Sequence, residues 1–135
     1  MTLSDLIIVA GHAIYTADDF DHPERDENWC LQSFQKGEPP FYLEHIRHGI
    51  ELVAANEKAL LYFSGGMTRV EAGRRSEGGS YRLLAEHCGW LSPGIADRVH
   101  AEEYARDSFE NLLFGLCGFH EITGAWPRQL TVVSW

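Results

Sequence analysis

Two short apolar runs, each stopping at glycine, constrain the fold more than any other feature of this chain. The first is Leu6-Ile7-Ile8-Val9-Ala10, which ends at Gly11. The second is Ala59-Leu60-Leu61-Tyr62-Phe63, which Ser64-Gly65-Gly66 follows at once. A continuous run of about five apolar residues is typical of a strand buried on both faces, as in a parallel sheet. The sequence therefore predicts a central sheet that contains both runs.

Helical patterns alternate with these strands. Steps of three and four predict a helix from Phe41 to Asn56, with Pro40 in its first turn and an apolar face made of Leu43, Ile46, Ile50 and Val53. Ser76 is a predicted N-cap for a second helix, which ends near Gly89 and buries Tyr81, Leu84, Ala85 and Cys88. A third helix is predicted to begin at Asp107 or Ser108, with a buried stripe of Phe109, Leu112, Leu113, Leu116 and Phe119.

A short strand within residues 95–101 and a last strand at residues 130–134 complete the order. Strands that alternate with helices predict an α/β fold, here a Rossmann-like three-layer sandwich with a mainly parallel sheet. The length of 135 residues predicts a single domain, residues 1–135. The polar stretch 16–40 is predicted to be a long surface loop with a helical turn around residues 29–34, of the kind that often forms a lid or binding loop.

The charge and cysteine content argue against several classes of partner and predict a cytoplasmic location. A formal net charge of -9 disfavours nucleic acid and anionic membrane surfaces. The three cysteines, Cys30, Cys88 and Cys117, show no C-x-x-C spacing and are predicted to be free thiols in a reducing compartment. No basic segment precedes the first apolar run, and that run is too short to span a bilayer.

The carboxyl ends of the predicted strands indicate where a ligand would bind, because ligands of parallel sheets bind beyond those ends. There the two glycines of Ser64-Gly65-Gly66 would let the main chain approach a ligand, and their N–H groups could hold an anion. A plain tight turn is the alternative. His12 would contact the ligand or move a proton, unless it is a half-buried histidine bonded to the main chain.

Polar residues further along the chain extend this predicted site. Arg74 would clamp a phosphate or carboxylate, although a solvated loop also explains it. Glu77 lies in the first turn of a helix, where the dipole favours a carboxylate without any function. A dense polar cluster enters the third helix, where capping is the alternative to ligand binding. The predicted ligand-binding set is Gly11, His12, Ser64, Gly65, Gly66, Arg74, Glu77, Glu103, Ser108, Glu110 and Asn111.

The patterns of metal centres and hydrolase triads are not complete in this sequence. His45 and His48 have a spacing that can share an ion, but no third ligand is placed, and no metal is predicted. The G-x-S-x-G nucleophile turn is absent, so no catalytic residue is assigned.

The ordered set of segments resembles the SanA/ElyC/YdcF-like family, a domain of unknown function. The residues concerned are residues 6–11, the strand and S-G-G turn of residues 60–66, Ser76-Glu77, residues 103–111 and residues 130–134. The long acidic loop after the first strand looks most like the fungal branch. The resemblance implies a Rossmann-like fold whose pocket takes a nucleotide-like or adenosyl-containing ligand. It does not identify a particular cofactor.

The chain departs from the family pattern in two places. Gly78 follows Glu77 where the family favours alanine, and the family continues past the last strand with a further helix, whereas this chain stops at Trp135. A domain without that C-terminal segment is expected to self-associate through its unfinished edge.

Together these observations predict a domain that binds a small anionic or nucleotide-like molecule at the strand ends. Two alternatives stay open: a non-catalytic, truncated paralogue that acts as a binding or regulatory protein, and an accessory protein of a fungal biosynthetic pathway.

Overall fold

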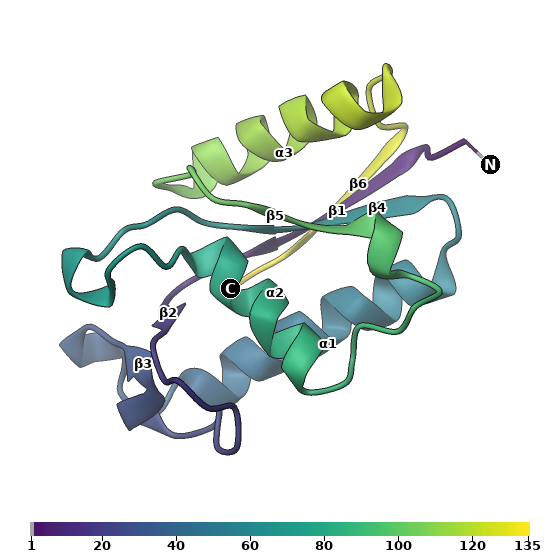
Figure 1. Cartoon of the computed structure of the whole chain (residues 1–135). Helices are drawn as coiled ribbons and strands as arrows, with labels where there is room; N and C mark the ends of the chain where they lie inside the picture. Colours follow the sequence, from purple (N-terminus) through teal and green to yellow (C-terminus); the bar gives the residue numbers. More distant parts are fainter. Residues whose placement is uncertain (1) are drawn as a thin grey trace.

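In the computed structural model, which describes residues 2–135, a four-stranded parallel sheet separates two helical layers (Figure 1). The strands are β1 (Asp5–Ala10), β4 (Ala59–Ser64), β5 (Val99–Glu102) and β6 (Gln129–Val133), and their order across the sheet is β5-β4-β1-β6. The helices α1 (Pro39–Ala55) and α2 (Glu77–His87) cover one face, and α3 (Ser108–Thr123) covers the other. The predicted α/β sandwich with a parallel sheet is confirmed.

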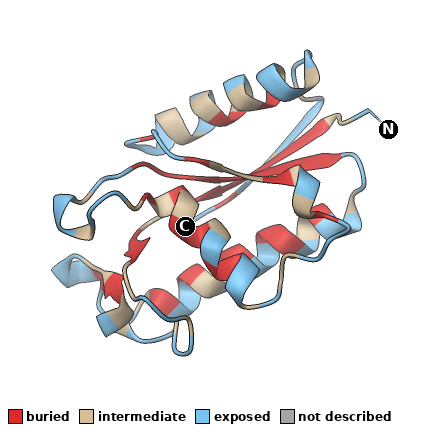
Figure 2. Cartoon of the chain, viewed as in Figure 1, coloured by how far each residue is buried: buried red, intermediate tan, exposed pale blue. Residues whose placement is uncertain are grey.

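The two apolar runs form the two central strands, which are buried on both faces (Figure 2). Ile7 and Val9 of β1 face the core beneath α1 and α2, whereas Leu6 and Ile8 face the smaller core beneath α3. This alternation is the period of two that a strand imposes on its side chains. It explains why neither run contains a polar residue at its centre.

The long loop after β1 has more structure than the sequence predicts. It contains a small antiparallel pair, β2 (Ile14–Tyr15) with β3 (Trp29–Cys30), and short 3-10 turns at residues 26–28 and 33–35. The predicted helical turn at residues 29–34 is therefore wrong in its first half. Trp29 is instead buried against Tyr15, and its indole N–H donates to the carbonyl of Pro23 at 2.7 Å.

The predicted buried stripe of the third helix is also wrong in part. Phe119 is buried, but Phe109 is 69% exposed, and Leu112 and Leu113 also face solvent. The reason is a pair of glycines, Gly115 and Gly118, that bring α3 close to the sheet. A Cβ at Gly115 would lie 2.5 Å from Ile8 Cδ1, and one at Gly118 would lie 2.6 Å from the Tyr62 hydroxyl. The helix packs through these glycines together with Phe119 and the partly buried Leu116, which leaves Leu112 and Leu113 on the solvent side.

Within residues 2–135, no helix has both the length and the apolar character needed to cross a bilayer.

Candidate functional site

The strand ends of the sheet converge on the side chain of Glu77. Gly11 follows β1, Ser64 ends β4, and both lie beside the first turn of α2. Ser76 caps that helix by accepting from the N–H of Gly79 at 2.8 Å, as the sequence predicts. Glu77 is thus the first residue of a helix whose start is docked against the carboxyl edge of the sheet.

Gly11 and Gly65 are glycine because Glu77 occupies the space beside them. A Cβ built on Gly11 would lie 2.7 Å from the Cβ of Glu77, and one on Gly65 would lie 2.5 Å from it. Gly65 also has a φ of 157°, which few other residues adopt. A larger residue at either position would push Glu77 out of its place. The two glycines are therefore explained by the room that the Glu77 side chain needs, without any contact to a ligand.

Burial raises the pKa of Glu77 from the ordinary 4.5 to about 7, since a desolvated carboxylate is unfavourable. Two weaker effects act in the opposite direction: the Thr68 hydroxyl donates to Oε2 at 2.8 Å, and the Arg69 charge favours the ionised form. A carboxyl group that titrates near neutral pH at the ligand edge of an α/β sheet is suited to donating or accepting a proton.

The N–H groups of the Ser64-Gly65-Gly66 turn already have partners inside the protein. Gly65 donates to the carbonyl of Glu102 at 3.0 Å, and Gly66 donates to the carbonyl of Ala105 at 2.8 Å. The expectation that these two groups hold an anion is therefore wrong. The turn instead joins β4 to the segment that follows β5.

Gly66 contributes through close packing and does not line the cleft. A Cβ at this position would lie 2.9 Å from the carbonyl oxygen of Ala105 and 3.1 Å from the carbonyl carbon of Tyr104. A larger residue there would displace the main chain between β5 and α3.

Glu102, which sequence reasoning did not select, fastens the ends of β4 and β5 together. Its buried carboxylate accepts from the Ser64 hydroxyl at 2.6 Å and from the N–H groups of Tyr104 and Ala105 at 2.6 Å and 3.0 Å. Ser64 Oγ also lies 2.8 Å from the amide oxygen of Asn111. One hydroxyl proton serves one acceptor at a time, and the carboxylate is the stronger. The Asn111 amide thus keeps bonding capacity for the cleft beside it.

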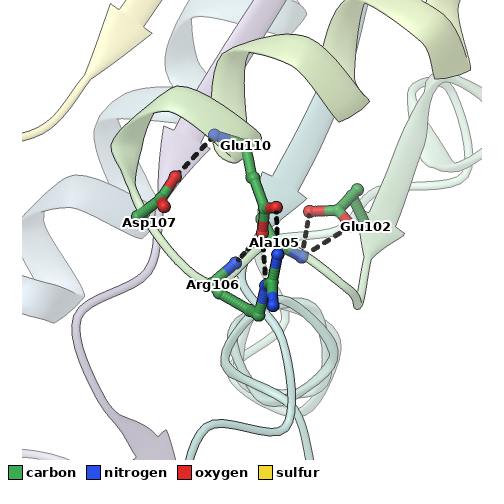
Figure 3. A network of polar contacts seen from close by, with 5 residues as sticks. All are labelled: Glu102, Ala105, Arg106, Asp107 and Glu110. Carbon is green, nitrogen blue, oxygen red and sulfur yellow. Dashed lines mark hydrogen bonds and ion pairs between the residues drawn. The ribbon is translucent and has the colours of Figure 1, made fainter.

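Glu110 has a structural partner of its own (Figure 3). Arg106 donates to it from its main-chain N–H at 2.9 Å, from Nε at 3.0 Å and from Nη2 at 2.8 Å. These hydrogen bonds lower the pKa of Glu110 to about 2. Asp107 caps α3 by accepting from the N–H of Glu110 at 2.8 Å. Glu110 therefore stabilises the start of α3.

A cleft of about 180 Å³ opens above Glu77, between the ends of β1 and β6 and the start of α3. This Glu77 cleft is lined by Ala10, Gly11, His12, Glu77, Ala105, Arg106, Asp107, Ser108, Asn111 and Ser134. Five of the predicted site residues meet in it: Gly11, His12, Glu77, Ser108 and Asn111. The lining does not include Ser64, Gly65, Gly66 or Glu110, which instead hold neighbouring main-chain segments in place.

Two predicted residues, Arg74 and Glu103, lie outside the Glu77 cleft and line a separate one with Ser76. Sequence reasoning also left out Ser134, which it had placed at a strand end, and Thr68, which bonds to Glu77. The position of Ser134 was a usable signal, whereas nothing in the sequence pairs Thr68 with Glu77.

His12 connects the Glu77 cleft to a group of aromatic rings. Its ring stacks on Trp135 and Tyr42, with centroids 5.5 Å and 6.0 Å apart, and lies 5.8 Å from the ring of His45. Burial lowers the pKa of His12, and the neighbouring His45 lowers it further. Its Nε2 atom is buried and has no hydrogen-bond partner within residues 2–135. The imidazole is therefore neutral at physiological pH.

The chain is similar to an uncharacterized protein of Saccharomyces cerevisiae, YOR238W, with 26% identity over 177 residues. The match covers 96% of this chain and 57% of the yeast protein, so the chain spans little more than half the length of this curated relative. No family model and no solved structure matches the sequence. The resemblance to the SanA/ElyC/YdcF-like family therefore stays a prediction.

The raised pKa of Glu77 predicts that the fold loses stability as the pH rises from about 4.5 to 7. In that window the unfolded chain has released this proton while the folded chain still holds it, so a higher pH favours unfolding. Urea denaturation at pH 5 and pH 8 is expected to show the wild type losing about 2 kcal/mol more than Glu77→Gln. Equal losses in both proteins would show that the Glu77 carboxyl titrates normally.

Proposed function

We propose that the Glu77 cleft binds a small anionic or nucleotide-like molecule and that Glu77 exchanges a proton with it. The observation that carries this proposal is the cleft at the strand ends, in which the carboxyl group of Glu77 is half-buried between two glycines. This partial burial raises its pKa to about 7. Ligands of open α/β sheets bind at this edge. A protonated Glu77 is a neutral hydrogen-bond donor, which an anionic oxygen requires.

The start of α3 supports the choice of an anion. Asp107 satisfies the N–H of Glu110, but the N–H groups of Ser108 and Phe109 have no acceptor within residues 2–135. Free N–H groups in the first turn of a helix attract negative charge. Asp107, and Glu77 when it is ionised, would repel the same anion. Binding should therefore require the protonated form of Glu77.

The size of the Glu77 cleft limits what enters it. A volume of about 180 Å³ is room for about six water molecules, which suits a phosphate or a sugar but not a whole nucleotide. The rest of such a ligand would lie outside the cleft, toward Trp135, which is exposed and stacked on the cleft residue His12. A flat ring of this kind is a good surface for a base. This arrangement supports a nucleotide-like or adenosyl-containing ligand.

The family resemblance and the composition of the chain also support this proposal. A SanA/ElyC/YdcF-like, fungal-type domain acting in the cytoplasm agrees with the acidic composition and with the three thiols, none of which forms a disulfide. A binding or regulatory protein would use the same cleft without turnover. The tests below address binding, which both forms of the proposal require.

The ligand is expected to bind more tightly when Glu77 carries its proton. We would screen cyclic AMP, S-adenosylhomocysteine and ribose 5-phosphate by thermal shift and then titrate cyclic AMP by calorimetry. Its phosphodiester keeps one charge between pH 6 and pH 8, so only the protein titrates. The affinity of the wild type should fall about tenfold between these pH values, because a carboxyl with a pKa of about 7 loses its proton there.

Two variants make this experiment specific. Glu77→Gln, which keeps a neutral donor, should bind with an affinity that does not depend on pH, and the exposed Glu57→Gln should behave like the wild type. If no compound binds, or if Glu77→Gln keeps the tenfold dependence, the proposal is wrong.

We also propose that the chain self-associates through β6. Within residues 2–135 this strand pairs with β1 alone and so forms an edge of the sheet, and Leu130 and Val132 on it are 39% and 52% exposed. An apolar groove of about 160 Å³ separates Val132 from the exposed Leu112 of α3. An exposed edge strand can pair with a strand of another chain. Two copies related by a twofold axis would pair β6 with β6 and bury both grooves.

Sedimentation velocity over a range of concentrations tests this self-association. The wild type should show a dimer that dissociates on dilution, and Val132→Glu should be monomeric, since a carboxylate would be desolvated at the interface. Val70→Glu, at an apolar position that is 94% exposed elsewhere, is the matched control and should still dimerise. A wild type that stays monomeric at every concentration would exclude the interface.

A further inference from the structure

Arg74, the arginine that sequence reasoning assigned to the ligand, lies at a second cleft. It opens beside α2 and the end of β5, has a volume of about 370 Å³, and shares no lining residue with the Glu77 cleft. We propose that this arginine cleft, defined by Arg74, Arg75 and Arg82 with Ser76 and Glu103, binds a small phosphorylated molecule.

The arginine cleft is rich in positive charge, although the chain as a whole is acidic. The protein has 11 Lys and Arg against 20 Asp and Glu, yet three arginines line one cleft and only one carboxylate, Glu103, accompanies them. The Glu103 carboxylate is turned toward Ser76, whose hydroxyl donates to it at 2.8 Å. The lining therefore has a net charge of about +2, which attracts an anion of matching charge.

Two of the guanidinium groups are fixed in place and still have unused N–H groups. Arg75 donates through Nη1 to the carbonyls of Tyr15 and Ala17, both at 2.9 Å, and Arg82 donates through Nε to the carbonyl of Val99 at 3.0 Å. Each guanidinium has five N–H donors, so these bonds hold the group without exhausting it. Both side chains are about one-third exposed, so they can meet a ligand.

The carboxylates nearest these two arginines are weak competitors for a ligand. The Arg75–Asp18 and Arg82–Glu86 pairs are 3.9 Å and 3.7 Å long, and both carboxylates lie largely in solvent. Exposed pairs of this length contribute little. A phosphate that accepts two hydrogen bonds from one guanidinium fork would displace them at small cost.

Arg74 completes the cleft as its third cation. It is exposed, and no hydrogen bond or ion pair holds it among residues 2–135. The volume is typical of a small-molecule site, and the overall charge of -9 disfavours nucleic acid. Paired, preorganised guanidinium groups are best matched by a phosphate, whose several oxygens accept from more than one fork at once.

Calorimetric titration with inorganic pyrophosphate at pH 8 and low ionic strength tests the proposal. Removing one charge-assisted contact with Arg74→Gln should weaken binding about tenfold or more. Arg25→Gln removes an exposed arginine far along the chain and is the matched control, with an expected change of less than about twofold. Arg82→Lys, which keeps the charge but loses the fork, should also weaken binding.

Ser108→Glu separates this site from the Glu77 cleft, because it adds a negative charge to that cleft at an exposed position, and it should bind pyrophosphate as the wild type does. No binding to the wild type at millimolar concentration, or equal weakening by Arg74→Gln and Arg25→Gln, would overturn the proposal. So would a loss of pyrophosphate binding in Ser108→Glu, which would assign the anion to the other cleft. An acidic peptide that binds more tightly than pyrophosphate would overturn the choice of a phosphorylated small molecule.

Discussion

The position of the Glu77 carboxyl group is the constraint on which the ligand edge of this protein depends. It lies where α2 meets the ends of β1 and β4, and Gly11 and Gly65 leave it the space of a side chain. Gly78 brings the helix equally close to the sheet, since a Cβ there would lie 2.5 Å from the carbonyl oxygen of Phe63. Three glycines from separate segments thus make room for one half-buried carboxyl group, whose partial burial raises its pKa.

Two carboxyl groups at this edge have opposite roles because their surroundings differ. Glu102 is buried, but two N–H groups and the Ser64 hydroxyl donate to it, so its function is to join β4, β5 and the segment before α3. Glu77 receives only the Thr68 hydroxyl, so burial dominates its titration. Fully bonded carboxylates support a structure, whereas poorly solvated ones are available for proton exchange.

The sequence predicted the parts of this molecule that follow from local patterns. Buried strands, the Ser76 cap and the gathering of Gly11, Glu77 and Asn111 at one edge all follow from periodicity and chain order. Three features depend on contacts between distant residues and could not be predicted. The N–H groups of Gly65 and Gly66 donate to carbonyls at and just after the end of β5, Arg74 lines another cleft, and α3 packs through its glycines. Predicting any of these three features would have required the orientation of the residues in the folded protein.

The central claim is that Glu77 titrates near neutral pH, and a carboxyl ¹³C NMR titration measures this directly. Protein labelled at the glutamate side-chain carboxyl would be titrated from pH 3 to pH 9, with Glu77→Gln used to assign the signal. The Glu77 resonance should shift with a midpoint of about 7. A midpoint near the ordinary 4.5 would show that the group is well solvated and would contradict the account of this edge.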